Sequence, residues 1–167
     1  MWSLNPPHPP VDNANTEMEV VKKYYGTDKF PEIDSNLVVR KNANYKVAGF
    51  ARNYFAAVTS IDTYIGQVLD ELQKMGVLDN TIVLFSSDHG ELLGSHDLTG
   101  KNQVETESLA VPLIIHWPKG LKSDINEVLF GTPDIMPTIL GLAGLSNKIP
   151  KEVEGNNFAS LLKNTKS

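Results

Sequence analysis

Apolar side chains recur three or four positions apart from residue 45 to residue 75, and the pattern ends at Gly76. This spacing places them on one face of an α-helix, and glycine commonly follows the last residue of a helix. About thirty residues at about 1.5 Å each predict a helix about 45 Å long. The apolar positions are Val47, Phe50, Ala51, Tyr54, Phe55, Val58, Ile61, Ile65, Val68, Leu69, Leu72 and Met75.

Two short apolar runs follow, "TIVLF" at 81–85 and "VPLIIHW" at 111–117. Continuous apolar runs of this length are typical of strands buried on both faces, as in a parallel sheet. The segment "TPDIMPTILGLAGL" then predicts a short helix that starts near Asp134 and ends at Gly141 or Gly144. The order helix, strand, loop, strand, helix indicates an α/β fold.

The beginning of the chain has a different character. Four prolines within the first ten residues favour extended backbone. Residues 12–44 are of mixed polarity, are broken by Gly26 and Pro31, and are expected to be mostly irregular. We therefore divide the chain into a loop-rich arm, 1–44, and an α/β portion, 45–167.

Composition narrows the class of protein. Of 167 residues, 41% are hydrophobic and 21% are charged, as in ordinary globular domains. A net charge of -5 provides no basic field for nucleic acid, and no apolar stretch is long enough to span a membrane. The N-terminus lacks the basic and apolar regions of a signal peptide. The chain has no cysteine, which excludes disulfides and thiolate metal ligands in it.

The stretch "SSDHGELLGSHDLTGK", residues 86–101, carries the candidate chemistry. Asp88 and His89 follow the first predicted strand, and ligands of open α/β sheets bind beyond the carboxyl ends of strands. A carboxylate oxygen and an imidazole nitrogen are ligands for a divalent cation. Lys101 adds a compact positive charge that suits a sulfate- or phosphate-like anion. Together they predict a clamp for an anionic ester.

A simpler interpretation stands beside this one. Asp-His-Gly after a strand is often only a turn, in which Asp88 bonds to nearby backbone. Taken singly, Lys101 is typical of a surface lysine, and His96 of a loop histidine bonded to backbone. The site hypothesis therefore requires Asp88, His89 and Lys101 to lie on the same side of the strand end.

The block "TIVLFSSDHGELLGSHDLTGKN", followed by "ES" and "VPLIIHWPKG", closely resembles the sulfatase family of the alkaline phosphatase superfamily. The resemblance continues in "YFAAVTSIDTYIGQVLDELQKMGVLDNT", "TPDIMPTILGLAGL", "EGNNFASLL" and the proline-histidine segment "NPPHPP". It covers nearly the whole chain and is weakest in residues 12–44. It implies part of an alkaline phosphatase-like sandwich, with a mainly parallel sheet flanked by helices.

The resemblance also implies roles for individual residues. Asp88 and His89 would coordinate a divalent cation, with calcium as the first expectation and manganese or zinc as alternatives that suit a histidine better. Lys101 would contact the sulfate. His8 would lie near the leaving-group oxygen and donate a proton, and His96 would line the substrate pocket. Glu107 is expected to have a structural role.

Parts of the family pattern are absent from this chain. No Cys/Ser-x-Pro/Ala-x-Arg motif provides a formylglycine nucleophile, and the early Asp-Asp metal ligands are missing. Family members also continue beyond "LLKN" into a smaller antiparallel subdomain. We expect residues 1–167 to be the middle-to-C-terminal part of a catalytic domain, inactive alone, with formylglycine only in the missing half. A periplasmic or secreted location is typical of the family, but the compartment stays open.

The expected function is that of a sulfuric ester hydrolase fragment acting on a sulfate ester, with sulfated carbohydrate among the candidates. Phosphonate monoester and phosphodiester hydrolases of the same superfamily are the nearest alternative, since they resemble the same block. A non-catalytic relic or binding module is the other. Strands without their neighbours would expose sheet edge and apolar surface, which favours self-association.

Overall fold

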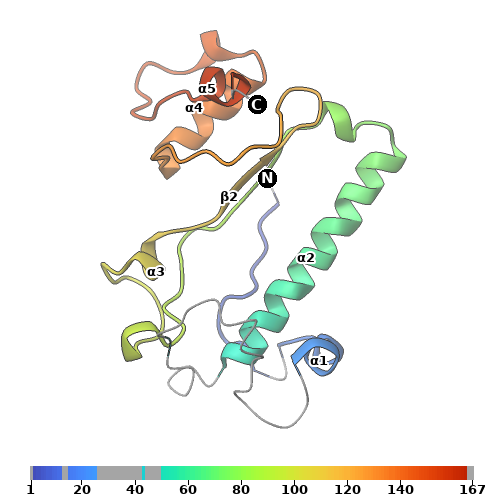
Figure 1. The fold of residues 1–167 in the computed structure, drawn as a ribbon, viewed down its shortest axis with the longest axis vertical. Coiled ribbons are helices and arrows are strands. Elements are labelled where there is room, and N and C mark those ends of the chain that lie inside the picture. The colour runs from blue at the N-terminus through green and yellow to red at the C-terminus, as the bar shows by residue number, and fades with distance from the viewer. Residues whose placement is uncertain (1, 13–14, 26–42, 44–49, 165–167) are drawn as a thin grey trace. The chain divides into compact units, whose positions relative to one another are not determined.

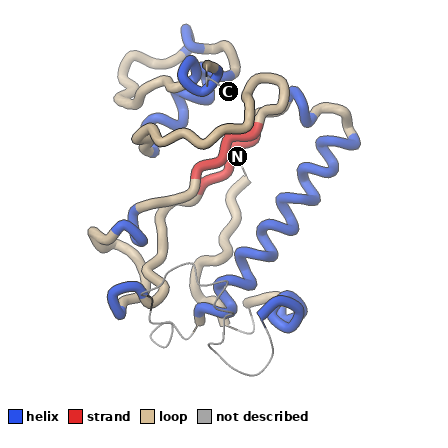
Figure 2. The backbone as a smooth tube through the Cα atoms, in the orientation of Figure 1, coloured by secondary structure: helices blue, strands red, loops and turns tan. Residues whose placement is uncertain are grey.

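A computed structural model of the chain describes residues 2–12, 15–25, 43 and 50–164 (Figure 1). The helices are α1 (Met18–Val20), α2 (Ala51–Lys74), α3 (Thr106–Leu109), α4 (Thr132–Leu142) and α5 (Ala159–Lys163), and the strands are β1 (Val83–Ser86) and β2 (Leu113–His116) (Figure 2). The predicted α/β class is confirmed. No helix in these ranges is long and apolar enough to cross a membrane. The chain forms two compact units, residues 1–71 with 86–113 and residues 72–85 with 114–167.

Helix α2 ends where the sequence predicts. Lys74 is its last residue, and Gly76 adopts a left-handed φ of 69° that lets the chain turn back. The amide of Val77 then donates to the Leu72 carbonyl at 3.1 Å, which satisfies a carbonyl at the helix end. The predicted helical positions 45–49 lie outside the described residues.

The beginning of α2 supports the loop that follows β1. Leu93 of that loop is buried against Ala51, the first residue of the helix, and Phe50, Tyr54 and Phe55 pack around the pair. Burying a leucine side chain contributes about 1.5–3 kcal/mol. This contact ties the loop with the candidate chemistry to a regular helix.

A short helical segment also packs on α2. α1 continues into a wider turn over Val21–Tyr25, within the stretch predicted to be mostly irregular. The Tyr25 hydroxyl hydrogen-bonds to the Thr59 hydroxyl at 2.7 Å, and its ring stacks on Phe55. The sequence pattern did not show this helical segment because it is too short for a helical period. Residues 13–14, 26–42 and 44 of the predicted irregular stretch lie outside the described residues.

Strands β1 and β2 form a two-stranded sheet. At one end of the pair, the amide of Lys119, which follows β2, donates to the carbonyl of Asp79, which precedes β1, at 3.2 Å. At the other end, the hydroxyl of Ser86, the last residue of β1, donates at 2.9 Å to the carbonyl of Pro112, which directly precedes β2. These contacts advance along the two segments in opposite directions, so the strands run antiparallel. The continuous apolar runs had suggested parallel strands. A direct return through a loop allows antiparallel pairing, whereas parallel strands need a longer crossover.

In the second unit, Asp134 joins two segments. One carboxylate oxygen accepts from the Gly131 amide at 2.8 Å and the other from the Asn156 amide at 2.6 Å. Buried Thr138, one turn further along α4, accepts from the Phe158 amide at 3.0 Å. Helix α4 starts at Thr132, two residues before the predicted start. These side chains hold residues 156–158 against α4.

We expect the stability of this unit to fall at acid pH because of Asp134. The amides of Asn156 and Gly131 hold the pKa of its carboxyl below the ordinary value. A lowered folded-state pKa stabilises the fold above about pH 4, the unfolded-state value, and this stabilisation is lost as pH falls through the lower folded value. Asp134→Asn should lower the thermal unfolding midpoint at pH 7 and weaken the dependence of that midpoint on acid. Circular dichroism melts from neutral pH downward measure both effects.

The matched control is Asp70→Asn, which changes an exposed carboxylate on α2. This variant should keep the wild-type midpoint and its acid dependence. Equal midpoints for wild type and Asp134→Asn at pH 7 would contradict the proposed contribution of Asp134.

Candidate active site

The segment that follows β1 is held against the chain that leads into β2. The Gly90 amide donates to the Ser108 carbonyl at 2.9 Å. A Cβ atom on Gly90 would collide with the carbonyl oxygen of Glu107, closer than any side chain can approach. The Ser108 hydroxyl, which is buried, accepts from the Gln103 amide at 3.2 Å. Only glycine therefore fits at position 90.

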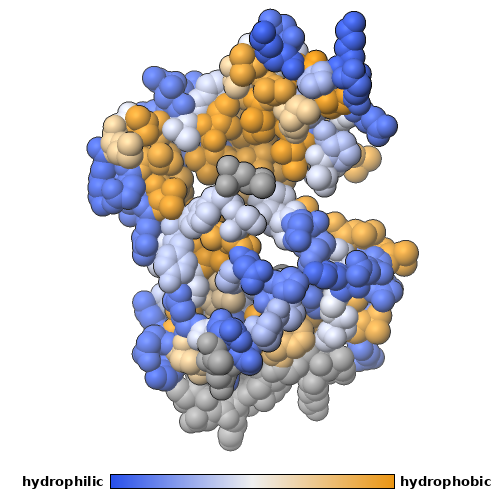
Figure 3. Space-filling view, turned by 180° about the vertical axis from the view of Figure 1, so that it is seen from behind, coloured by the Kyte–Doolittle hydropathy of each residue, from blue (hydrophilic) through white to orange (hydrophobic). Residues whose placement is uncertain are grey.

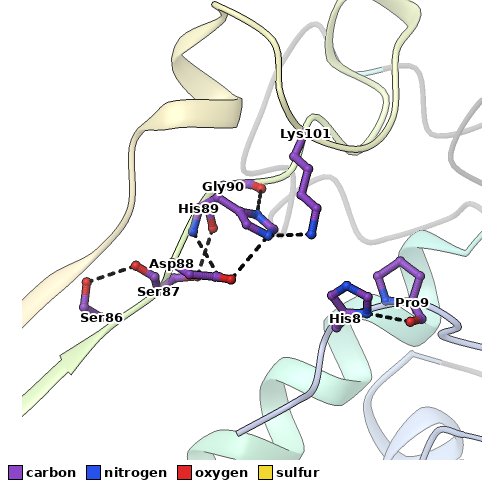
Figure 4. A network of polar contacts seen from close by, with 8 residues as sticks. All are labelled: His8, Pro9, Ser86, Ser87, Asp88, His89, Gly90 and Lys101. Carbon is purple, nitrogen blue, oxygen red and sulfur yellow. Dashed lines mark hydrogen bonds and ion pairs between the residues drawn. The ribbon is translucent and has the colours of Figure 1, made fainter. Parts of the chain in front are cut away.

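His89 has a defined hydrogen-bonding arrangement (Figure 4). Its Nδ1 lies 2.8 Å from the Gly90 carbonyl oxygen, which can only accept, so Nδ1 carries the proton. Nε2 then keeps its lone pair and accepts from the Lys101 ammonium at 2.7 Å. The ring is thus a neutral imidazole whose Nε2 can act as a ligand or an acceptor.

Asp88 lies on the other side of the same ring. Its Oδ2 is 3.5 Å from His89 Nε2, and its side chain is 82% exposed. Its Oδ1 accepts from the His89 amide at 3.0 Å, which is the local bonding that the turn interpretation expects. Slight burial raises the pKa of the Asp88 carboxyl, whereas the amides of Asp88 and His89 and the Ser87 hydroxyl lower it, and a positive charge on the His89 ring would lower it further. The net pKa lies below the ordinary value, so the carboxylate is ionised at neutral pH.

The structure brings Asp88, His89 and Lys101 together at the carboxyl end of β1, on one side, as the site hypothesis requires (Figure 4). Asp88 and His89 suit part of a cation site. Histidines that bind metals commonly donate their other ring N–H to a carbonyl, as His89 does to Gly90. Among the described residues, no group of three or more His, Cys, Asp or Glu side chains could hold a metal ion. A cation here would need further ligands.

His8 and His96 make other contacts. His8 is exposed, and its Nδ1 bonds to the Pro9 carbonyl at 2.7 Å; Figure 4 draws no bond from it to His89 or Lys101. His96 lies in the turn Ser95–Asp97, with Nε2 3.4 Å from Glu107 Oε2. This contact joins the turn to the segment that carries Glu107. The structure therefore places neither histidine within the cluster of Asp88, His89 and Lys101.

The loop between His89 and Lys101 has an unusual backbone. Three non-glycine residues of the loop, and Asn102 directly after it, adopt a positive φ: Leu93 at 45°, His96 at 57°, Asp97 at 58° and Asn102 at 66°. Such backbone strain costs energy, and strained residues cluster at functional sites. The sequence analysis did not predict these conformations. Asparagine and aspartate tolerate them, but leucine rarely does.

The sequence analysis also did not predict that the Glu91 side chain of this loop is buried. Glu91 is 8% exposed, and its Oε1 accepts from the amides of Gly100 and Leu93 at 2.5 and 3.2 Å. No spacing rule distinguishes it from a surface glutamate in a polar loop. Its burial depends on backbone that arrives nine residues later.

Known proteins resemble this chain over most of its length. An endo-4-O-sulfatase of Bacteroides thetaiotaomicron is 40% identical over 164 residues, which cover 96% of this chain and 32% of that protein. An ulvan-active sulfatase of Formosa agariphila is 32% identical over 98% of this chain and 37% of its own length. The chain thus spans about a third of the length of these curated relatives.

Solved structures agree with this. A structure from work on glycosaminoglycan metabolism by Bacteroides thetaiotaomicron matches with a TM-score of 0.87 and 38% identity, over 100% of this chain and 34% of that one. A phosphonate monoester hydrolase of Silicibacter pomeroyi matches less of it, with a TM-score of 0.65 and 32% identity over 72% of this chain and 24% of that one. The family model described as Sulfatase matches residues 1–145. The chain therefore belongs to the sulfatase family of the alkaline phosphatase superfamily.

Proposed function

We propose that this chain contributes cation- and sulfate-binding residues to the active site of a sulfatase that hydrolyses sulfate esters. The contact of Lys101 with His89, beside ionised Asp88, carries the proposal. A positive charge, an imidazole nitrogen and a carboxylate oxygen thus lie within one small cluster. These groups suit an anionic ester held by a divalent cation.

Asp88 and His89 would hold the divalent cation that the family implies. We propose calcium, with manganese or zinc as alternatives because an imidazole suits those ions better. When bound, the cation supplies positive charge that stabilises the developing charge of the reacting group. Nε2 of His89 has a single lone pair, so Lys101 must release it when the ring serves as a ligand. The ammonium is then available for a sulfate oxygen.

The roles proposed for the other residues follow from their chemistry. Lys101 stabilises the sulfate charge without transferring a proton. With Nδ1–H held by the Pro9 carbonyl, the doubly protonated His8 ring donates its Nε2 proton to the leaving-group oxygen and is left as the neutral imidazole. His96 contacts substrate from the edge of the pocket, beside Glu107. The formylglycine nucleophile would come from sequence outside this chain, which alone should give no turnover.

The substrate we propose is a sulfated carbohydrate. The relatives include an ulvan-active sulfatase, and one matching structure comes from work on glycosaminoglycan metabolism. A phosphonate monoester hydrolase is the second candidate, favoured by its resemblance to 72% of the chain and by the histidine ligand. A non-catalytic relic is a third, although a relic has no physical need for the cluster of Asp88, His89 and Lys101.

Self-association of this chain also stays a proposal. Ile114 of β2 is 57% exposed, although its strand reads as buried on both faces. Apolar side chains also gather on the surface of the part that contains α4 and α5 (Figure 3), where Met136, Leu145 and Leu161 are exposed. Exposed apolar surface of this kind promotes association between chains.

The first prediction separates the two hydrolase candidates. The full-length protein should hydrolyse an aryl sulfate with a higher kcat/KM than an aryl phosphonate monoester, because the family match is to sulfatases. Parallel assays with one shared nitrophenol leaving group measure this directly. A preference for the phosphonate would replace the proposal with the second candidate, and no turnover of either would favour the relic.

The second prediction concerns Lys101. Lys101→Ala should slow hydrolysis by about 10²-fold or more, similarly for all sulfate esters, because it removes an electrostatic contact with the reacting group. Lys122→Ala, which removes an exposed lysine elsewhere, is the matched control and should leave kcat/KM unchanged. An unchanged rate for Lys101→Ala would exclude Lys101 from the site.

The third prediction concerns His8. His8→Ala should slow esters of alkyl alcohols or sugars much more than nitrophenyl esters, because a poor leaving group depends on protonation. A plot of log kcat/KM against the pKa of the leaving group should therefore be steeper for the variant. Parallel plots would mean that His8 binds substrate but donates no proton.

A further inference from the structure

Buried Glu91 holds together the two ends of the loop between His89 and Lys101. Its Oε1 accepts from the Gly100 amide at 2.5 Å and from the Leu93 amide at 3.2 Å. Beside it, the Leu92 amide donates to the Gly100 carbonyl at 2.9 Å. Gly100 is thereby bonded through both of its peptide groups to the residues that follow His89.

These hydrogen bonds of Glu91 and Gly100 lie between His89 and Lys101, the two residues whose side chains are in contact. Glu91 is two residues after His89, and Gly100 directly precedes Lys101. The Lys101 side chain is long and has several rotatable bonds, so its backbone must be fixed if the ammonium is to reach one position. A carboxylate that accepts from backbone amides makes strong hydrogen bonds, especially where it is shielded from water.

We propose that Glu91 is a positioning residue that sets the place of Lys101 relative to His89 and the bound sulfate group. This inference rests on the proposed function of the site. Glu91 contacts neither substrate nor cation in it and acts through Gly100. Substituting a residue that orients a binding residue through hydrogen bonds typically lowers activity or affinity by about 10- to 100-fold.

The experiment compares Glu91→Ala, Glu91→Gln and the double variant Glu91→Ala/Lys101→Ala in the full-length protein. Glu91→Ala removes the acceptor, whereas glutamine keeps an oxygen that both amides can use. We expect Glu91→Ala to lower kcat/KM by about 10- to 100-fold and Glu91→Gln to restore most of it. In the Lys101→Ala background, Glu91→Ala should cause little further loss, because its effect passes through the lysine.

Glu127→Ala is the matched control, since it removes an exposed glutamate far along the chain, and it should leave activity unchanged. The proposal would be overturned if the fold-loss in kcat/KM of the double variant equals the product of the two single-variant losses, because Glu91 would then act independently of Lys101. So would a Glu91→Gln variant as impaired as Glu91→Ala. A Glu91→Ala protein that fails to fold is replaced by Glu91→Gln and Glu91→Asp, of which only the shorter aspartate should lose activity.

Hydrogen exchange measured by mass spectrometry gives a readout that does not need turnover. The peptide that covers residues 91–101 should lose amide protection in Glu91→Ala and keep it in Glu91→Gln. If the wild-type protein hydrolyses no sulfate ester, the proposed function fails, yet this comparison still decides whether Glu91 fixes the loop. Unchanged protection in Glu91→Ala would overturn the positioning role whatever the activity.

Discussion

The close approach of Gly90 to the backbone of Glu107 and Ser108 is the contact on which the site depends. It keeps the segment after β1 beside the segment that enters β2, where any side chain at position 90 would collide with a carbonyl oxygen. His89 bonds to the carbonyl of this same glycine, which fixes the tautomer of the ring. The position of one backbone segment thus determines which nitrogen faces Lys101.

Much of the fold could be predicted because its signals are local. The helical period and Gly76 placed the end of α2, and the run at 81–85 placed β1 within two residues. The direction of the strand pair could not be predicted, since an apolar run reads alike in parallel and antiparallel sheets. Direction depends instead on how residues 87–112 return, which leaves no periodic pattern.

The site divides in the same way. Asp88 and His89 could be placed by the rule that ligands bind beyond the carboxyl ends of strands, which needs no long-range detail. Lys101 was selected for its charge and by the family resemblance, because its approach to His89 depends on closure of the loop. The burial of Glu91 could not be predicted, because its partner amide at Gly100 arrives only when the intervening loop closes. The contact of His96 with Glu107 also joins residues eleven positions apart without regular spacing.

The neutral tautomer of His89 has a consequence for the charge of the site. Ionised Asp88 and the ammonium of Lys101 cancel, so the three side chains together carry no net charge. A divalent cation added to this cluster leaves it with two positive charges, and a sulfate monoester reduces that surplus by one. If the cluster binds a cation and an ester as proposed, each would favour the other's binding electrostatically, because the net charge of the three side chains attracts neither strongly.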